Sequence, residues 1–86
     1  MKKLLFSPHA TARISQRSSE FGLEWFEVKR RTIDTINQGC ISRKKKSKNH
    51  KVYYKYYPDN LSFFAVCKHG YGYVRVITII IKQGRE

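Results

Sequence analysis

Acidic residues are scarce in this 86-residue sequence, where six Asp and Glu accompany eighteen Lys and Arg and leave a net charge of +12 with neutral histidines. So few carboxylates argue against a magnesium-dependent nuclease, because that ion is held through carboxylate oxygens. The two cysteines, Cys40 and Cys67, lack metal-ligand spacing and are too few for a disulfide framework. There is no P-loop and no dinucleotide-binding glycine pattern. We therefore expect neither a metal ion nor a cofactor.

Long apolar runs are also missing. The longest, Val76–Ile81, is interrupted by Thr78 and is far too short to span a bilayer. The first six residues begin like a secretion signal, but Ser7 and Pro8 follow without a long apolar stretch or a cleavage site. We expect a cytoplasmic protein that does not contact membranes. The length predicts a single domain over residues 1–86.

The excess of positive charge is the strongest compositional signal. A small protein at +12 repels itself, which favours a polyanion as its partner. Residues 43–51 hold six of the cations, but removing that tract would still leave about +6. We predict that the chain binds nucleic acid. The alternatives are a solvated lysine-rich loop, a localisation signal, or a surface that docks an acidic partner protein.

The pattern of the sequence changes from helical to extended near its middle. Ser7 as N-cap and Pro8 at the first helical position predict a helix ending near Arg17. A second helix is expected from Leu23 to about Gln38 with Phe26 on its apolar face and Gly39 at its C-terminal cap. Strands are expected over residues 51–57, 61–68 and 73–82, with residues 1–6 as a short strand or an extended arm. This order predicts an α+β fold, with two N-terminal helices on one face of a three- to four-stranded antiparallel sheet.

Several residues are candidates for binding nucleic acid. Alternation places Lys51, Tyr53, Lys55 and Tyr57 on one face of a strand, where cations could hold phosphates while a ring stacks on a base. The alternative is that tyrosines favour strands and lysines protect sheet edges. The full set of candidates is Lys44, Lys45, Lys46, Lys48, His50, Lys51, Tyr53, Lys55 and Arg75. Strict alternation places Thr78 on the opposite face from Arg75 unless a bulge intervenes.

The first expected helix carries the candidate chemistry. His9, Arg13, Gln16 and Arg17 form one polar stripe, while Ala10 turns toward the core with Ile14. An imidazole can move protons near neutral pH, and guanidinium groups can bind a phosphate and stabilise its developing charge. These three functional groups suit RNA cleavage without a metal ion. The alternative is a helix-start histidine beside solvated arginines. His50 and His69 are each a possible second acid or base, or a turn residue.

The segment Ser7–Arg17 resembles the His-Ala-x-x-Arg-x-x-x-Arg opening of a widespread bacterial and phage domain family. Gly39 after the second helix and the Ile-Thr of the closing strand are similar as well. That family is grouped with the RelE/ParE-like toxins in the barnase–EndoU–colicin–RelE (BECR) fold. The resemblance implies a metal-independent ribonuclease with RNA lying against its sheet, and carries His9, Arg13, Arg17 and Thr78 over as site residues. Four residues, 18–21, intervene where the family passes almost directly from its second Arg to Gly.

These observations predict a small, basic, toxin-like endoribonuclease that cleaves RNA, single-stranded or ribosome-associated, by transesterification through the 2′-hydroxyl. His9 is the expected acid or base, Arg13 and Arg17 bind the scissile phosphate, and Tyr53 stacks on a base. An acidic antitoxin or immunity protein is the expected protein partner. The rival hypothesis is a phage or plasmid protein that binds nucleic acid or the ribosome without catalysis. Members of the wider fold include inactive binders, so fold alone does not decide between them.

Overall fold

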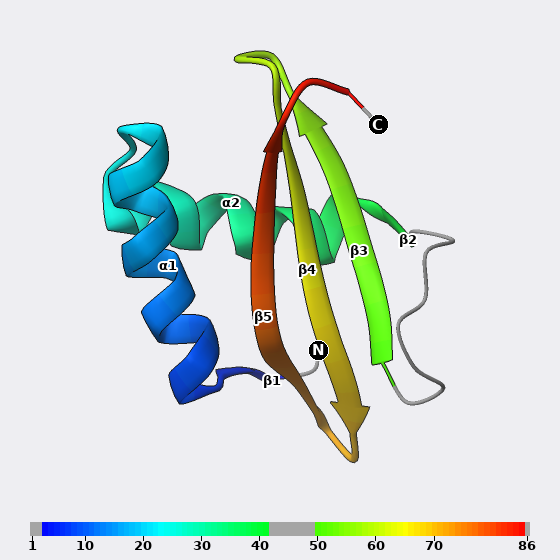
Figure 1. Cartoon of the computed structure of the whole chain (residues 1–86). Helices are drawn as coiled ribbons and strands as arrows, with labels where there is room; N and C mark the ends of the chain where they lie inside the picture. The colour runs from blue at the N-terminus through cyan, green and yellow to red at the C-terminus, as the bar shows by residue number, and fades with distance from the viewer. Residues whose placement is uncertain (1–2, 42–49, 86) are drawn as a thin grey trace.

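The computed structural model describes residues 3–41 and 50–85, which form two helices and a five-stranded sheet (Figure 1). In chain order the elements are β1 (Lys3–Phe6), α1 (Pro8–Phe21), α2 (Trp25–Gln38), β2 (Cys40–Ile41), β3 (His50–Tyr57), β4 (Leu61–Gly70) and β5 (Tyr73–Gln83). The strand order is β1-β5-β4-β3-β2, with β1 parallel to β5 and every other pair antiparallel. The α+β class is confirmed. The sequence predicts three to four antiparallel strands, whereas the sheet has five and is mixed. The chain before α1 adds a parallel edge strand, and Cys40 and Ile41 add an antiparallel one.

Helix α1 begins where the sequence predicts and ends later. The Ser7 hydroxyl accepts a hydrogen bond from the Ala10 N–H at 3.0 Å, as an N-cap does. The helix continues past Arg17 to Phe21 and stops at Gly22, whose left-handed φ of 66° suits a residue without a Cβ. Serine's weak helix propensity suggested an earlier end. The Arg17–Glu20 ion pair and the packing of Phe21 on the core support the last turn.

Helix α2 turns threonines rather than large apolar residues toward the sheet. Val28, Thr32 and Thr35 are buried, and the two hydroxyls donate to the carbonyls of residues one turn earlier. Phe26 is 57% exposed, so its expected place in the core is wrong. A threonine hydroxyl that hydrogen-bonds within its own helix can be buried and still have a partner. A prediction that places only apolar residues in the core therefore misses these threonines.

Gly39 ends α2 for a different reason from the one expected. Its φ of −80° and ψ of 175° are extended, not left-handed. A Cβ at this position would collide with the carbonyl oxygens of Thr35 and Tyr54, because the chain passes directly from the helix to the strand edge. Gly22 is the residue that provides a left-handed cap.

Both helices lie on one face of the sheet, with α1 packed on β5 and α2 crossing β4 and β3 (Figure 1). The main core lies between helices and sheet. Its buried members are Ala10, Ile14, Val28, Tyr57, Leu61, Phe63, Ala65, Cys67, Val74, Val76, Ile79 and Ile81. A second buried cluster, Val52, Phe64 and Val66, lies on the face that carries no helix, which we call the open face.

A bulge in β5 changes which side chains reach the open face. Val66 pairs with Thr78 and Cys67 with Val76, so Ile77 is the extra residue. Val76 and Ile79 therefore both belong to the main core, although they are three residues apart. As a consequence Arg75 and Thr78 lie on the same face, which strict alternation forbids.

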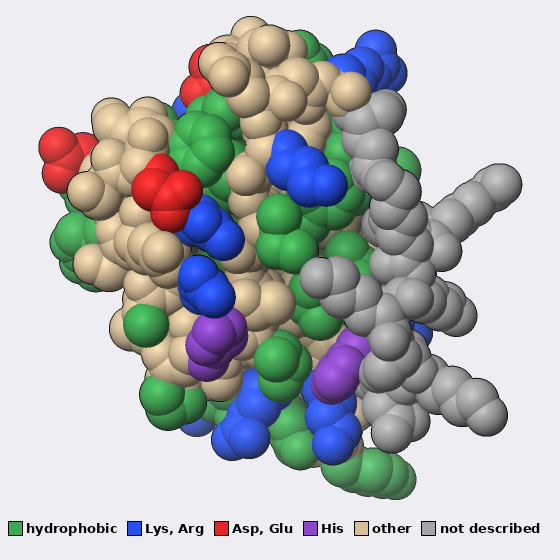
Figure 2. Space-filling model, in the orientation of Figure 1, with side chains coloured by type: hydrophobic (Ala, Val, Ile, Leu, Met, Phe, Trp, Pro, Cys, Tyr) green, Lys and Arg blue, Asp and Glu red, His purple; other side chains and the backbone are tan. Residues whose placement is uncertain are grey.

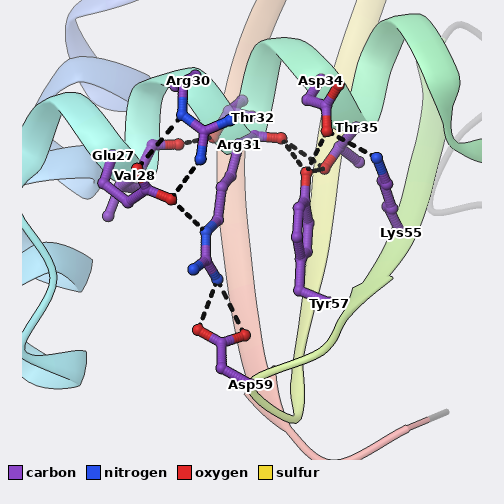
Figure 3. Close-up of polar contacts among 10 residues, drawn as sticks. All are labelled: Glu27, Val28, Arg30, Arg31, Thr32, Asp34, Thr35, Lys55, Tyr57 and Asp59. Atoms are coloured by element: carbon purple, nitrogen blue, oxygen red, sulfur yellow. Dashed lines mark hydrogen bonds and ion pairs between the residues drawn. The ribbon is translucent and has the colours of Figure 1, made fainter.

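A network of charged and hydroxyl groups fixes α2 to the sheet (Figure 3). Arg31 binds Glu27 at 2.7 Å and Asp59 at 2.8 Å, and its guanidinium lies 4.9 Å from the ring centre of Tyr57. The Tyr57 hydroxyl lies 2.9 Å from the Arg31 carbonyl and 3.2 Å from the Asp34 carboxylate. Burial raises the pKa of Tyr57 to about 12. This network attaches the middle of α2 to β3 and to the turn after it.

Candidate functional site

The stripe His9, Arg13, Gln16 and Arg17, which we call the α1 stripe, is present as the sequence predicts. The Arg13 Nε donates to Nε2 of His9 at 3.4 Å, and the same guanidinium donates to the Gln16 side chain at 2.7 Å. His9 is exposed, while Ala10 and Ile14 are buried on the other side of the helix. Because its Nε2 accepts, the proton of the neutral His9 ring lies on Nδ1. The imidazole and one guanidinium therefore meet at the surface.

Arg17 is held one turn further along α1. Its guanidinium forms an ion pair with Glu20 at 2.8 Å, and its side chain is 21% exposed. Its Nε is buried and has no hydrogen-bond partner among the described residues. An unsatisfied buried N–H on a charged group costs free energy. Arg17 is therefore bound to Glu20 and not to the His9–Arg13 pair, although all three side chains project from one side of the helix.

Thr78 lies beside the start of α1. The Ser7 N–H donates to the Val76 carbonyl and the Ser7 hydroxyl to the Ile77 carbonyl, each at 3.0 Å. These bonds fix the helix start at the β5 bulge, one residue before Thr78. The bulge also places Thr78 on the open face with Arg75. The first turn of α1, which carries His9, therefore borders the open face at this bulge.

The open face carries a row of basic groups across three strands. His50 of β3 pairs in register with Lys68 of β4, which pairs with Arg75 of β5. Lys68 and Arg75 are exposed, and neither forms an ion pair with the part of the chain that the structure describes. Like charges directly opposite one another destabilise a sheet. The Lys68–Arg75 pair therefore lowers the stability of the hairpin unless an anion binds there.

Aromatic and aliphatic side chains lie between this row and the other end of the sheet. Tyr54 packs on Phe64 with ring centres 5.1 Å apart, and the Lys82 ammonium lies 5.7 Å from the Phe64 ring centre. Arg85 lies 5.7 Å from the ring centre of Tyr56. Figure 2 shows Lys, Arg and His side chains around hydrophobic ones on this side of the molecule, over both α1 and the sheet. Cations around an apolar centre can hold phosphates while rings contact bases.

Three of the predicted binding residues lie elsewhere, together with Tyr57. Lys51, Tyr53, Lys55 and Tyr57 do share one face of β3, as alternation predicts, but this is the helix-covered face. Lys55 binds Asp34 at 2.6 Å. The Tyr53 hydroxyl lies 2.7 Å from Nε2 of His69, and its burial raises the pKa of Tyr53. The polar ends of Tyr53, Lys55 and Tyr57 therefore contact the protein itself, whereas Lys51 is exposed. Lys44, Lys45, Lys46 and Lys48 lie outside the described residues.

Sequence reasoning missed Lys68, Lys82 and Arg85 as binding candidates. One signal was available for Lys68. A two-residue turn at Tyr71 and Gly72 makes residues 68 and 75 equidistant from the hairpin tip, which places Lys68 directly opposite Arg75. Lys82 and Arg85 follow the bulge, and no periodic pattern assigns their face.

The carboxylates are concentrated in the helical layer. The ion pairs of the described residues join Glu20 to Arg17, Glu27 to Arg30 and Arg31, Asp59 to Arg31, and Asp34 to Lys55. Hydrogen bonds from Arg30 and Arg31 lower the pKa of Glu27, and the Lys55 hydrogen bond lowers that of Asp34. Positive charge in the helical layer is therefore partly compensated, while the Lys68–Arg75 pair is not.

No family model, curated protein or solved structure matches this chain. Neither described helix is long and apolar enough to cross a membrane. Within residues 3–41 and 50–85, no three His, Cys, Asp or Glu side chains gather as ligands for a metal ion.

Proposed function

We propose that this chain binds RNA along the open face and cleaves it at the α1 stripe, as a small ribonuclease resembling the RelE/ParE-like toxins of the BECR fold. The observation that carries the proposal is the Lys68–Arg75 pair, two cations placed directly opposite one another without a carboxylate. A polyanion converts that repulsion into binding free energy. The α1 stripe borders the same face at the β5 bulge, so one bound strand can reach both.

The residues of the stripe suit cleavage through the 2′-hydroxyl of the RNA. The His9 Nε2, released from its long hydrogen bond with Arg13 as that guanidinium binds the phosphate, removes the hydroxyl proton. The oxygen attacks the adjacent phosphorus while the bond to the 5′-oxygen breaks. The leaving oxygen takes a proton from an acid or from water, giving a cyclic phosphate end. Arg13 and Arg17 bind the phosphate oxygens, where negative charge increases in the transition state. Thr78 offers a hydroxyl to the strand beside them.

This function implies the partners that the sequence analysis expects. RNA, free or associated with the ribosome, is the ligand of the open face, and the protein acts on it in the cytoplasm. A toxin of this kind needs an acidic antitoxin or immunity protein, whose carboxylates would cover the same cations.

The first prediction concerns catalysis. His9→Ala abolishes cleavage of a single-stranded RNA in EDTA and leaves the affinity within about threefold, because His9 moves protons and makes few binding contacts. Denaturing gels measure cleavage, and fluorescence anisotropy measures binding. An RNA with one 2′-deoxynucleotide at the cleaved position is the substrate control and stays intact. Loss of affinity together with activity would contradict a catalytic role for His9.

A binder without catalysis is the second candidate. It is favoured by the Arg17–Glu20 ion pair, which occupies one of the two guanidiniums, and by the position of His9 on an exposed surface. Such a protein yields no product in EDTA but still binds RNA through the open face. In that case Lys68→Ala with Arg75→Ala weakens binding, whereas the matched control Arg30→Ala, which removes a cation on α2, does not.

A further inference from the structure

A second concave site lies on the other side of α1 from the stripe. It is a pocket of about 450 Å³ between α1, the start of α2 and β1. Phe6, Ile14, Leu23 and Trp25 provide its apolar surface. A volume of this size, apolar with a few polar groups, is typical of sites for small molecules. Nothing in the proposed binding of RNA uses it.

The hydroxyl groups of the pocket all lie on one wall, and its charged groups on the other. Hydroxyls come from α1, at Thr11, Ser15, Ser18 and Ser19. Thr11 donates to the Ser7 carbonyl and Ser18 to the Ser15 carbonyl, so those two hydroxyl protons are already used. The hydroxyls of Ser15 and Ser19 form no hydrogen bond with described residues. One wall of the pocket can therefore donate to or accept from a ligand.

Lys29 gives the pocket a positive charge next to its aromatic rings. Its ammonium lies 5.3 Å from the ring centre of Phe6 and 6.0 Å from that of Trp25. It forms no ion pair with the described residues, in contrast to Arg30 and Arg31 beside it in the sequence. Cation–π contacts orient this ammonium without neutralising it. A cation held at an aromatic wall suits a ligand with an aromatic body and an anionic end.

We infer that the pocket between α1 and α2 binds a flat aromatic carboxylate, with its ring against Trp25 and Leu23 and its carboxylate at Lys29. Trp25 is 58% exposed, so a large part of its ring is free to stack on a ligand. Glu24 also borders the pocket, and its charge opposes an anion. The carboxylate therefore lies at the Lys29 end, and Glu24→Gln raises its affinity.

Trp25 makes the inference directly testable, because it is the one tryptophan of the sequence. We expect naphthalene-1-acetate to shift the Trp25 indole N–H signal saturably in ¹⁵N–¹H spectra. The neutral analogue naphthalene-1-acetamide binds about fivefold more weakly, as expected when a single partly exposed charge pair is lost. Lys29→Gln weakens the acetate to the level of the amide and leaves the amide unchanged. Ser15→Phe, at an exposed helical position, fills the pocket and abolishes both.

The matched control is Lys82→Gln, which removes a lysine from the open face and leaves both ligands unaffected. The remaining signals of each spectrum report whether the variant is folded. The inference is overturned if the Trp25 signal does not shift up to the solubility limit, if acetate and amide bind equally, or if Lys82→Gln weakens the acetate as much as Lys29→Gln does. RNA binding is unchanged by a saturating ligand, so this site and the open face are tested separately.

Discussion

Two neighbouring arginines show how burial decides what an ion pair contributes. Arg31 and Arg30 share the Glu27 carboxylate, but the Arg31 side chain is 14% exposed and that of Arg30 is 65% exposed. Burial lowers the pKa of Arg31, but its hydrogen bonds to Glu27 and Asp59 outweigh this and raise it. Arg31 also packs on Tyr57 and Phe63. Both the charge of Arg31 and its packing therefore stabilise the fold.

We expect Arg31→Met to lower the free energy of unfolding by about 2–3 kcal/mol, since it leaves Asp59 without its ion-pair partner, removes one of the two arginines on Glu27 and breaks the cation–π contacts with Tyr57 and Phe63. Arg30→Met removes an exposed pair and costs roughly 0.5 kcal/mol or less. Urea unfolding followed by circular dichroism measures both. Equal losses for the two variants would mean that the contacts of Arg31 with Asp59 and the rings add nothing.

The burial of Cys67 and Tyr57 predicts that the free energy of unfolding falls at high pH. Burial raises the pKa of Cys67 from 9.0 to about 12 and that of Tyr57 from 10.0 to about 12. A raised pKa in the folded state means that the folded protein keeps protons that the unfolded chain loses. Stability is therefore complete below pH 9 and falls between pH 9 and 12, by about 1.4 kcal/mol per pH unit for each proton.

Cys67→Ala separates the two groups. The variant starts less stable, because a buried side chain is shortened. Its stability begins to fall only above about pH 10, where Tyr57 loses its proton in the unfolded chain but keeps it in the folded protein. The measurement is the free energy of unfolding in urea at pH steps from 8 to 11, with Cys40→Ala, at an exposed cysteine, as the control. An onset at pH 9 in Cys67→Ala would contradict the assignment.

At the scale of elements, the cations opposite one another in the hairpin of β4 and β5 lower its stability but favour the proposed binding of RNA. Lys68→Glu places a carboxylate opposite Arg75 and replaces repulsion with attraction. We expect the free energy of unfolding to rise by about 0.5–1 kcal/mol. The same change weakens RNA binding at least about tenfold, because one phosphate contact is lost and a like charge is added. Lys68→Gln is the matched control and lies between the two in both measurements. If both properties fall together, Lys68 serves the hairpin and not a ligand.

The elements with strong local signals were predictable from the sequence. Ser7 followed by Pro8 marks a helix start by backbone chemistry alone, and the structure has the helix there. The three long strands follow from alternation and turn residues. β1 and β2 were not predictable as members of the sheet, because a two-residue strand carries no period and each residue of β1 pairs with one seventy positions further along the chain.

The candidate site was predictable where it depends on a helix and not where it depends on a sheet face. Spacing of four residues brings His9 and Arg13 together whatever the helix packs on. The face of β3 was assigned correctly as a set, but alternation cannot say which set the helices cover. Tyr53 and Lys55 therefore lie against the helical layer. Arg75 and Thr78 share a face only because Ile77 bulges, and a bulge leaves little trace in a single sequence.

At the scale of the whole molecule, charge is divided between two layers. The described carboxylates lie in α1, in α2 and the residue before it, and in the turn after β3, and Figure 3 shows the ion pairs of Glu27, Asp34 and Asp59. The open face has cations without such partners. The net charge of +12 therefore acts as repulsion on the fold and as attraction on a polyanion.

Salt should therefore move stability and binding in opposite directions. Between about 20 and 300 mM NaCl the screening of self-repulsion raises the free energy of unfolding, measured in urea because guanidinium is itself a salt. Over the same range RNA affinity falls, with a log–log slope of roughly −0.7 for each phosphate neutralised on a single strand. Removing Lys68 and Arg75 together makes that slope shallower by about 1.4, whereas Arg30→Ala leaves it unchanged. A fold that loses stability in salt would show that its ion pairs outweigh the repulsion, and the like-charge pair of the open face would then need no anion to explain it.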